Sequence, residues 1–415
     1  MADERLEFSA RPIVREAPST GGYTEDAPAV DGLAAPSNGR YNTAIRHGFG
    51  VISDEWMEYL AESFWNYFED KRHETGGRAV IQDKEQESWR ITDRHRTVNA
   101  ALVLCLNLGV DPPDIIKTQP CAKMEAWTNP TQIPDSKKAI EQIGKSLQAQ
   151  YETLSTRTKY KQCLDPNAED AKRFCVGLRR SAREEQILFH YNGHGVPRPT
   201  PSGEIWVFNR GYTQYIPVSL YELQSWLGAP VIYCFDCSGA GHIVSNFLEF
   251  VEKRKAQERE KGQRDPSATP AAAYDMCIQM AACRADEILP MHPKLPADMF
   301  TCCITTPVEI AVKWFVMQNN SMLGLDSDNI VIPGKVSDRR TPLGELNWIF
   351  TAITDTIAWS ALETPLFKRL FRQDLVVAAM FRNFLLAVRI MQVHNCHPVS
   401  SPALPDTHDH PLWAS

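Results

Sequence analysis

The sequence predicts an α/β fold, in which a mainly parallel sheet is sandwiched by helices and is followed by an α-helical segment. Between Thr97 and about Thr306, short apolar runs alternate with stretches that place apolar residues at helical spacing. The runs are continuously apolar, which is typical of parallel strands that are covered on both faces. After Pro307 only helical patterns follow.

The bulk composition is that of an ordinary soluble globular protein. The 415 residues are 43 % hydrophobic and 23 % charged, close to the average for such proteins. A formal net charge of −7 argues against a nucleic-acid-binding surface, which needs a basic face. We find no apolar run as long as the ~18 residues of a membrane span, and no secretory signal in MADERLEFSA. We therefore expect no nucleic acid partner and no direct membrane insertion.

Cysteine usage indicates a reducing compartment. The eleven cysteines lie mostly inside apolar runs such as ALVLCLNL and FTCCITT, where they read as small buried hydrophobic residues. A secreted protein in an oxidising compartment would rarely have so many cysteines without the spacing of a disulfide framework. We therefore expect a cytoplasmic protein. We recognise no cofactor motif, because Gly144-Lys145-Ser146 lacks the upstream glycine of a phosphate loop.

Residues 1–45 are expected to be a flexible N-terminal arm. They are rich in Pro, Gly, Ser, Ala and Asp, and they lack the apolar density that offsets the entropy of ordering. The α/β domain is expected to span residues 46–330. It begins with an amphipathic helix over residues 53–70, which places Trp56, Leu60, Phe64 and Tyr67 at helical spacing.

Within this domain the expected strands and helices follow in order. The first strand is VNAALVLCLNLG, closed by a turn at residues 109–113. Two helices follow, one with Ile140, Ile143, Leu147 and Tyr151 on one face and one over residues 168–186. Further strands are expected at QILFH, APVIYCFD, AYDMCIQMAAC and MFTCCITT, with helices over 219–228 and 241–260 between them.

Residues 331–415 are expected to belong to a helical segment that is truncated at DHPLWAS. Helical patterns begin at residue 307 and cover 307–319, 341–359 and 365–392. Thr341-Pro342 is a helix start signal. Several of these patterns are apolar on more than one face, so the helices are expected to pack among others, as in an α-solenoid.

Two strand ends carry reactive side chains. His194 stands in the turn NGHG after QILFH, and Asp236-Cys237-Ser238 follows APVIYCF. The carboxyl ends of parallel strands share one edge, where loops build functional sites. Caspase-type cysteine peptidases have a similar arrangement, with a histidine about 50 residues before the cysteine. Glycine lets the backbone turn tightly or adopt φ > 0, so valine at Gly195 is expected to destabilise the domain.

Metacaspases resemble this pattern more closely, with a GHG turn and a later D-x-C-x-S-G stretch. On that pattern Ser238 takes the nucleophile position two residues after Asp236, and the cysteine stands one place early, at Cys237. Neighbouring side chains at a strand end point in opposite directions, so Cys237 is expected to point into the sheet if Ser238 faces His194. A serine needs a third group to orient its base, and no acidic third member is evident beside HYNGHG. We therefore interpret His194, Cys237 and Ser238 as a degenerate dyad without catalytic function.

Metal binding is not expected at these motifs. His190 and His194 have the spacing of half an H-E-x-x-H motif, but that motif needs a helix, whereas a strand and two glycines stand here. Cys234 and Cys237 form a C-x-x-C by spacing alone, and in an extended strand their sulfurs point to opposite faces.

Longer stretches carry a more specific resemblance. GVDPPD, FHYNGHGVPRPTPSGEIWVFN, YTQYIPVSLYELQSWLGAPVIYCFDCSGAG and PLGELNWIFTAITDTIAW closely resemble the Raptor family, and the match runs from about Trp89 to His410. The resemblance implies a caspase-like domain that leads into an armadillo-type solenoid. It also implies a non-catalytic scaffold subunit of TOR complex one. Such a subunit binds the TOR kinase, presents substrates with a TOR-signalling motif, and links the complex to Rag GTPases at the lysosomal or vacuolar surface.

An active caspase- or metacaspase-like cysteine peptidase is the alternative interpretation. It would place a Cys237 sulfur or a Ser238 oxygen within ~3.5 Å of a His194 nitrogen, beside an open pocket. The sequence assigns no residues to a substrate-motif site.

Overall fold

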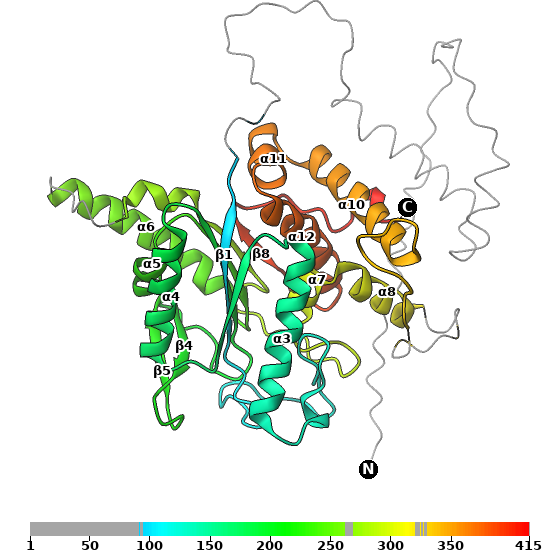
Figure 1. Cartoon of the computed structure of the whole chain (residues 1–415), viewed down its shortest axis with the longest axis horizontal. Coiled ribbons are helices and arrows are strands. Elements are labelled where there is room, and N and C mark those ends of the chain that lie inside the picture. Colours follow the sequence, from blue (N-terminus) through cyan, green and yellow to red (C-terminus); the bar gives the residue numbers. More distant parts are fainter. Residues whose placement is uncertain are drawn as a thin grey trace, which may run out of the picture.

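The structure is a computed structural model that describes residues 91–414, apart from 92–93, 262–268, 320–323, 325–326 and 328–329. The arm expected over residues 1–45 and the helix expected over 53–70 lie outside the described residues. A central β-sheet lies between helices on both faces (Figure 1). The predicted α/β class is therefore confirmed.

In the described chain the central sheet has six strands, in the order β2-β1-β3-β6-β7-β8. Neighbouring strands run parallel except for β8, which is antiparallel to β7. The bounds are Thr97–Leu104 for β1, Lys159–Leu164 for β2, Gln186–Asn192 for β3, Val231–Asp236 for β6, Ile278–Ala281 for β7 and Val399–Ser401 for β8. β3 and β6 are buried along their whole length. This is why both strands read as continuous apolar runs in the sequence.

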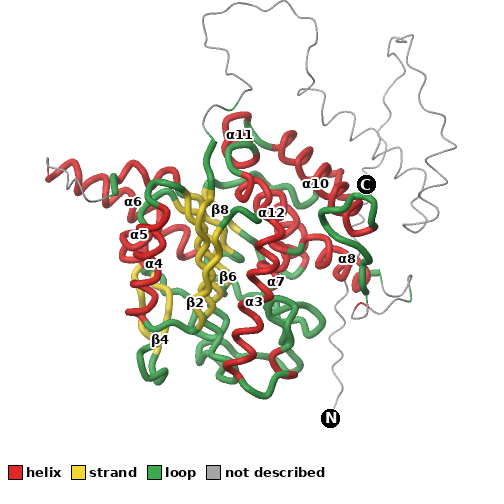
Figure 2. Tube along the Cα trace, viewed as in Figure 1, coloured by secondary structure: helices red, strands yellow, loops and turns green. Residues whose placement is uncertain are grey.

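Helices cover both faces of this sheet, and the strands lie between them (Figure 2). One face is covered by α4 (Ala168–Ala182), α5 (Leu220–Leu227) and α6 (Gly241–Lys261). The other is covered by α3 (Ser136–Leu154), α7 (Met299–Thr305) and α12 (Leu375–Val393). A separate hairpin of β4 (Glu204–Phe208) and β5 (Tyr215–Ser219) follows β3.

Two expectations for the later part of the chain are wrong. The run MFTCCITT forms the helix α7 and not a strand. Every residue of α7 is buried, so the run has no solvent-facing polar side, and its pattern cannot distinguish a short helix from a strand. Strands also continue after Pro307, because β8 pairs with β7. β2 and the β4–β5 hairpin are not among the strands that the sequence predicts, because they are short and only partly buried.

The helices after Pro307 pack around the same core as the sheet. They are α8 (Pro307–Gln318), α10 (Pro342–Ala361), α11 (Thr364–Phe371) and α12. Asp374 joins α12 to β1, because its Oδ1 accepts the N–H of Val376 at 2.7 Å and its Oδ2 accepts the N–H of Thr97 at 2.8 Å. The armadillo-type solenoid and the domain boundary near residue 330 stay predictions.

By length and composition alone, α12 could cross a membrane, contrary to the expectation that no apolar run reaches that length. In the structure 67 % of this stretch is buried inside the protein. Asn383 in its middle donates to the Ile304 carbonyl of α7 at 2.6 Å, and Arg382 contacts Asp355 of α10 at 3.5 Å. These contacts are those of a core helix.

Candidate functional site

The neighbouring strands β3 and β6 bring the two predicted motifs together at their carboxyl ends. Asn192, the last residue of β3, is in register with Asp236, the last residue of β6. The turn with His194 follows directly, and the N–H of Gly193 donates to the Asp236 carbonyl at 3.0 Å. Both motifs therefore lie at one edge of the sheet, as the parallel arrangement predicts.

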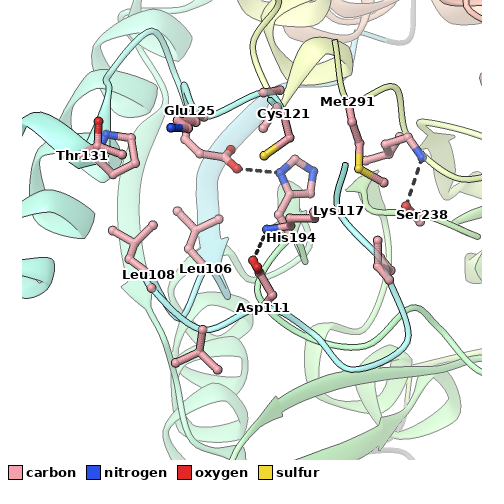
Figure 3. Close-up of a pocket in the computed structure, with 18 of the residues that line it drawn as sticks. Leu106, Leu108, Asp111, Lys117, Cys121, Glu125, Thr131, His194, Ser238 and Met291 are labelled. Atoms are coloured by element: carbon pink, nitrogen blue, oxygen red, sulfur yellow. Dashed lines mark hydrogen bonds and ion pairs between the residues drawn. The ribbon is translucent and has the colours of Figure 1, made fainter. Parts of the chain in front are cut away.

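His194 lies between two carboxylates. Its Nδ1 is 2.8 Å from Glu125 Oε1 (Figure 3), and its Nε2 is 3.2 Å from Asp236 Oδ1. Burial by itself lowers the pKa of the His194 ring, but the two carboxylates outweigh burial and hold this pKa well above its usual range. Near neutral pH these surroundings favour the imidazolium form of the ring, which donates from both nitrogens. It has no lone pair with which to accept a proton from a nucleophile.

Glu125 is an acidic partner of His194 that the sequence does not predict. Its position is set by Asn192, whose Nδ2 donates to Glu125 Oε2 at 3.0 Å while its Oδ1 accepts the N–H of His194 at 3.2 Å. Glu125 precedes His194 by 69 residues and lies in an irregular connection between β1 and α3. The expectation that no acidic group accompanies HYNGHG is wrong, because this partner comes from a segment with no regular pattern.

Two further residues that were missed complete the buried cluster around Asp236. Thr301, in the first turn of α7, donates its N–H to Asp236 Oδ2 at 3.0 Å, and its hydroxyl also donates to this oxygen. Burial raises the pKa of Asp236, but the ion pair with His194 and the Thr301 hydrogen bond outweigh it and lower the pKa. Asp298 is also buried, and burial together with the Glu125 and Asp236 carboxylates raises its pKa well above the usual range. These surroundings disfavour the charged form of Asp298.

Cys237 and Ser238 point to different surroundings. Cys237 lies in the hydrophobic core and is 1 % exposed, and burial raises the pKa of its thiol well above the usual range. A thiol in this state is a poor nucleophile, because the thiolate is the reactive form. The Ser238 hydroxyl accepts the N–H of Leu289 at 3.0 Å. The ring nitrogens of His194 make their hydrogen bonds to Glu125 and Asp236, and not to either of these side chains.

A cavity of about 290 Å³ opens beside this cluster. His194 and Ser238 both border it (Figure 3). Most of its remaining surface is apolar and comes from the loop after β1 and from the segment before α7; these residues are Leu106, Leu108, Val110, Ile115, Leu289, Pro290 and Met291. Lys117 lies in the wall and pairs with Asp111 at 2.6 Å. The site thus keeps an open pocket next to a histidine that carries a fixed charge.

Gly195 is required by a close approach of two backbone segments. An ideal Cβ at this position would lie 1.9 Å from the Leu106 carbonyl oxygen. The N–H of Gly195 donates to the Cys105 carbonyl at 2.8 Å, which holds the turn against the end of β1. Gly195 is not among the residues with positive φ. The sequence suggested two reasons for a glycine at position 195, a tight turn and a backbone with positive φ. The tight contact applies, and the positive φ does not.

His190 does not share a site with His194. Its ring is fully buried in β3, where Nδ1 lies 3.1 Å from the Tyr151 hydroxyl of α3. Burial lowers the pKa of His190 to about 4, so the ring is neutral at physiological pH. This contact fixes α3 on the sheet.

The fold and the site define a caspase-like α/β domain whose histidine is ion-paired at both ring nitrogens. Residues 95–247 match the family model described as the Raptor N-terminal CASPase-like domain. The region that carries the predicted motifs is therefore similar to the N-terminal caspase-like domain of Raptor, as the resemblance predicted.

Several relatives are highly similar along most of the chain. The Target of rapamycin complex 1 subunit KOG1 of Saccharomyces cerevisiae is 57 % identical over 412 residues, which cover 90 % of this chain and 26 % of that protein. The subunit mip1 of Schizosaccharomyces pombe is 58 % identical over 379 residues, which cover 89 % of this chain and 28 % of that protein. The crystal structure of Chaetomium thermophilum Raptor matches with 54 % identity and a TM-score of 0.72, over 86 % of this chain and 31 % of that one. This chain therefore spans between a quarter and a third of these relatives.

Proposed function

We propose that this chain is the N-terminal part of a non-catalytic scaffold subunit of TOR complex 1. The observation that carries the proposal is the double ion pair of His194 with Glu125 and Asp236. A histidine that is paired at both ring nitrogens cannot act as the general base of a peptidase. This supports a binding role for the domain instead of a catalytic one. The assembly into TOR complex 1 is supported by relatives above 50 % identity that are named as subunits of this complex.

The chemistry of the site disfavours the alternative of an active peptidase. Amide hydrolysis needs a nucleophile that gives its proton to a neutral base within hydrogen-bonding distance. Here the imidazolium of His194 is saturated with carboxylate partners, and the Cys237 thiol is buried with a raised pKa. The Ser238 hydroxyl lies on the cavity, but it accepts a backbone hydrogen bond.

The same proposal includes the roles that the family resemblance implies. The scaffold would bind the TOR kinase, present substrates that carry a TOR-signalling motif, and contact Rag GTPases. It would act in the cytoplasm and at the lysosomal or vacuolar surface. The helices after Pro307 leave Leu346, Trp348 and Ile349 of α10 exposed, which is compatible with further protein contacts.

Co-precipitation tests the scaffold function directly. A tagged form of the 415-residue chain is incubated with purified TOR kinase, and the retained kinase is quantified. We expect retention, and equal retention by a folded variant that carries both Cys237→Ala and Ser238→Ala. Failure of the folded wild-type chain to retain the kinase would contradict the proposal.

A second assay tests whether the domain is a peptidase. The chain is incubated with an electrophilic peptide probe, and labelled residues are identified by mass spectrometry. We expect no labelling at Cys237 or Ser238. Labelling at either residue that requires His194 would overturn the non-catalytic assignment, whatever the result with the kinase.

A further inference from the structure

A second and larger hollow lies near the amino ends of the strands, opposite the carboxyl ends that carry His194. Its volume is about 690 Å³. It is bordered by the start of β1, the start of β2 and the end of α4. Because the strands are parallel, the amino ends of β1 and β2 lie one strand length, roughly 20 Å, from the carboxyl ends that carry His194. The hollow is therefore separate from the site described above.

The lining of this hollow is rich in cations. It contains Arg96 before β1, Arg157 and Lys159 at the start of β2, and Arg183 at the end of α4, and all four are exposed. Within the described ranges none of these four side chains forms an ion pair with a carboxylate. Two carboxylates, Glu184 and Glu185, also border the hollow. The lining is thus net positive in a protein whose overall charge is −7.

Simple structural roles explain these cations only one at a time. An arginine at the C-terminal end of a helix interacts favourably with the helix dipole, which accounts for Arg183 at the end of α4. A lysine on an outermost strand discourages unwanted strand pairing, which accounts for Lys159. Neither role explains why four cations from three elements border one hollow. Arg183 also holds a left-handed backbone with φ of 55°, which is costly for a residue other than glycine.

The chemistry of the lining selects for phosphate groups. Guanidinium groups bind phosphate oxygens through two parallel hydrogen bonds, and three of the four cations are arginines. The adjacent strand β2 is outermost in the sheet as far as the structure describes the chain, and it pairs there with β1 on one side. An extended peptide can add to such an edge through main-chain hydrogen bonds.

We propose that this basic hollow is a binding site for a phosphorylated peptide segment. The segment runs along the outer edge of β2 and places its phosphate groups among Arg96, Arg157, Lys159 and Arg183. This site is independent of His194 and goes beyond the scaffold function, because it makes docking at this edge depend on phosphorylation of the partner.

Fluorescence anisotropy with a labelled peptide that carries two phosphoserines tests the site on the whole 415-residue chain. We expect saturable binding that weakens with increasing salt, and no binding of the same peptide without phosphate. The variant Arg96→Gln/Arg157→Gln should bind about tenfold or more weakly, since each guanidinium removed costs charge-assisted hydrogen bonds. The reverse change, Glu184→Gln/Glu185→Gln, should strengthen binding.

Matched controls separate this site from general electrostatics. Lys137→Gln/Lys138→Gln removes the same charge from the exposed start of α3, and it should change the affinity less than twofold. Thermal melting verifies that each variant is folded. Equal weakening by both double variants, or no binding by the wild type, would refute the site. If inorganic pyrophosphate alone bound as tightly as the phosphopeptide, the assignment to a peptide would be overturned.

Discussion

His194 and Asp236 form an ion pair across the ends of two neighbouring strands, with Nε2 at 3.2 Å from Oδ1. In a working dyad this nitrogen would face the nucleophile and accept its proton. Here it donates to a carboxylate that also accepts two hydrogen bonds from Thr301 of α7. Under the proposed non-catalytic function, the displaced cysteine would therefore not be the sole reason for the missing base. The carboxylates that surround His194 would also prevent it from accepting a proton.

Restoring the missing cysteine should not restore peptidase activity. In the variant Ser238→Cys the new thiol borders the cavity, but both nitrogens of His194 remain bound to Glu125 and Asp236. Without a neutral imidazole nearby the thiol is not activated. We expect no cleavage of fluorogenic peptides above the level of the control variant Ser238→Ala. If Ser238→Cys cleaved these peptides and Ser238→Ala did not, His194 would have to exchange one of its carboxylate partners for the new thiol.

The pH dependence of stability should carry the signature of this cluster. The pKa of His194 is raised in the folded state. Its contribution to stability is therefore full below the unfolded value of about 6.5 and is lost as pH rises through the folded value. Urea unfolding of wild type and His194→Gln over an alkaline pH series should show a stability difference that narrows with rising pH. A stability difference that stayed constant across this pH series would contradict the ion pair.

The contribution of Asp236 to stability should be lost at acid pH, whereas that of His194 is lost at alkaline pH. Its pKa is lowered in the folded state, so its contribution is present above the unfolded value of about 3.9 and is lost as pH falls through the folded value. Asp236→Asn should therefore differ most from the wild type near neutral pH in the same unfolding assay. A difference that stayed constant down to strongly acid pH would contradict the ion pair.

Removing Glu125 should destabilise the fold and lower the pKa of His194. Glu125→Gln keeps a hydrogen-bond acceptor near Nδ1 but removes one of the two charges that face the partly buried ring. We expect a loss of about 2–3 kcal/mol in the free energy of unfolding, somewhat less than for breaking a buried pair completely. NMR titration of the His194 ring should report the lower pKa. Glu141→Gln, at an exposed position of α3, should change neither quantity.

The sequence predicted the strands that hold the site but not the cluster that decides its chemistry. The apolar runs of β3 and β6 are long and continuous, and their ends place His194 and Asp236 on one edge. Glu125 lies in a connection without periodicity. Thr301 lies in a short apolar run whose pattern predicts a strand, whereas the run forms the helix α7. Partners that come from irregular or ambiguous segments leave no local pattern, since tertiary packing alone brings them together.

Position 195 should tolerate no residue larger than glycine. A Cβ would lie 1.9 Å from the Leu106 carbonyl oxygen, so one of two paired backbone segments must move. We expect Gly195→Ala to reduce the free energy of unfolding by about 3 kcal/mol or more, in the range of strongly strained substitutions. Gly177→Ala is the matched control, because its Cβ on α4 would meet nothing within 4 Å. That change should be neutral or stabilise by up to about 1 kcal/mol. Similar melting temperatures for the two variants would show that the turn can yield.

Asp374 should couple the C-terminal helices to the sheet. Its Oδ1 caps the first turn of α12, and its Oδ2 accepts the N–H and hydroxyl of Thr97 at the start of β1. Asp374→Ala leaves these buried donors without an acceptor, so we expect a loss of about 2–4 kcal/mol. Asp135→Ala removes an exposed cap at the start of α3 and should cost only about 1 kcal/mol. Unfolding followed by circular dichroism should remain a single transition in the wild type, because α12 shares the core of the sheet. If Asp374→Ala instead produced two transitions, with the sheet melting at its wild-type temperature, the helices after Pro307 would be an independent unit.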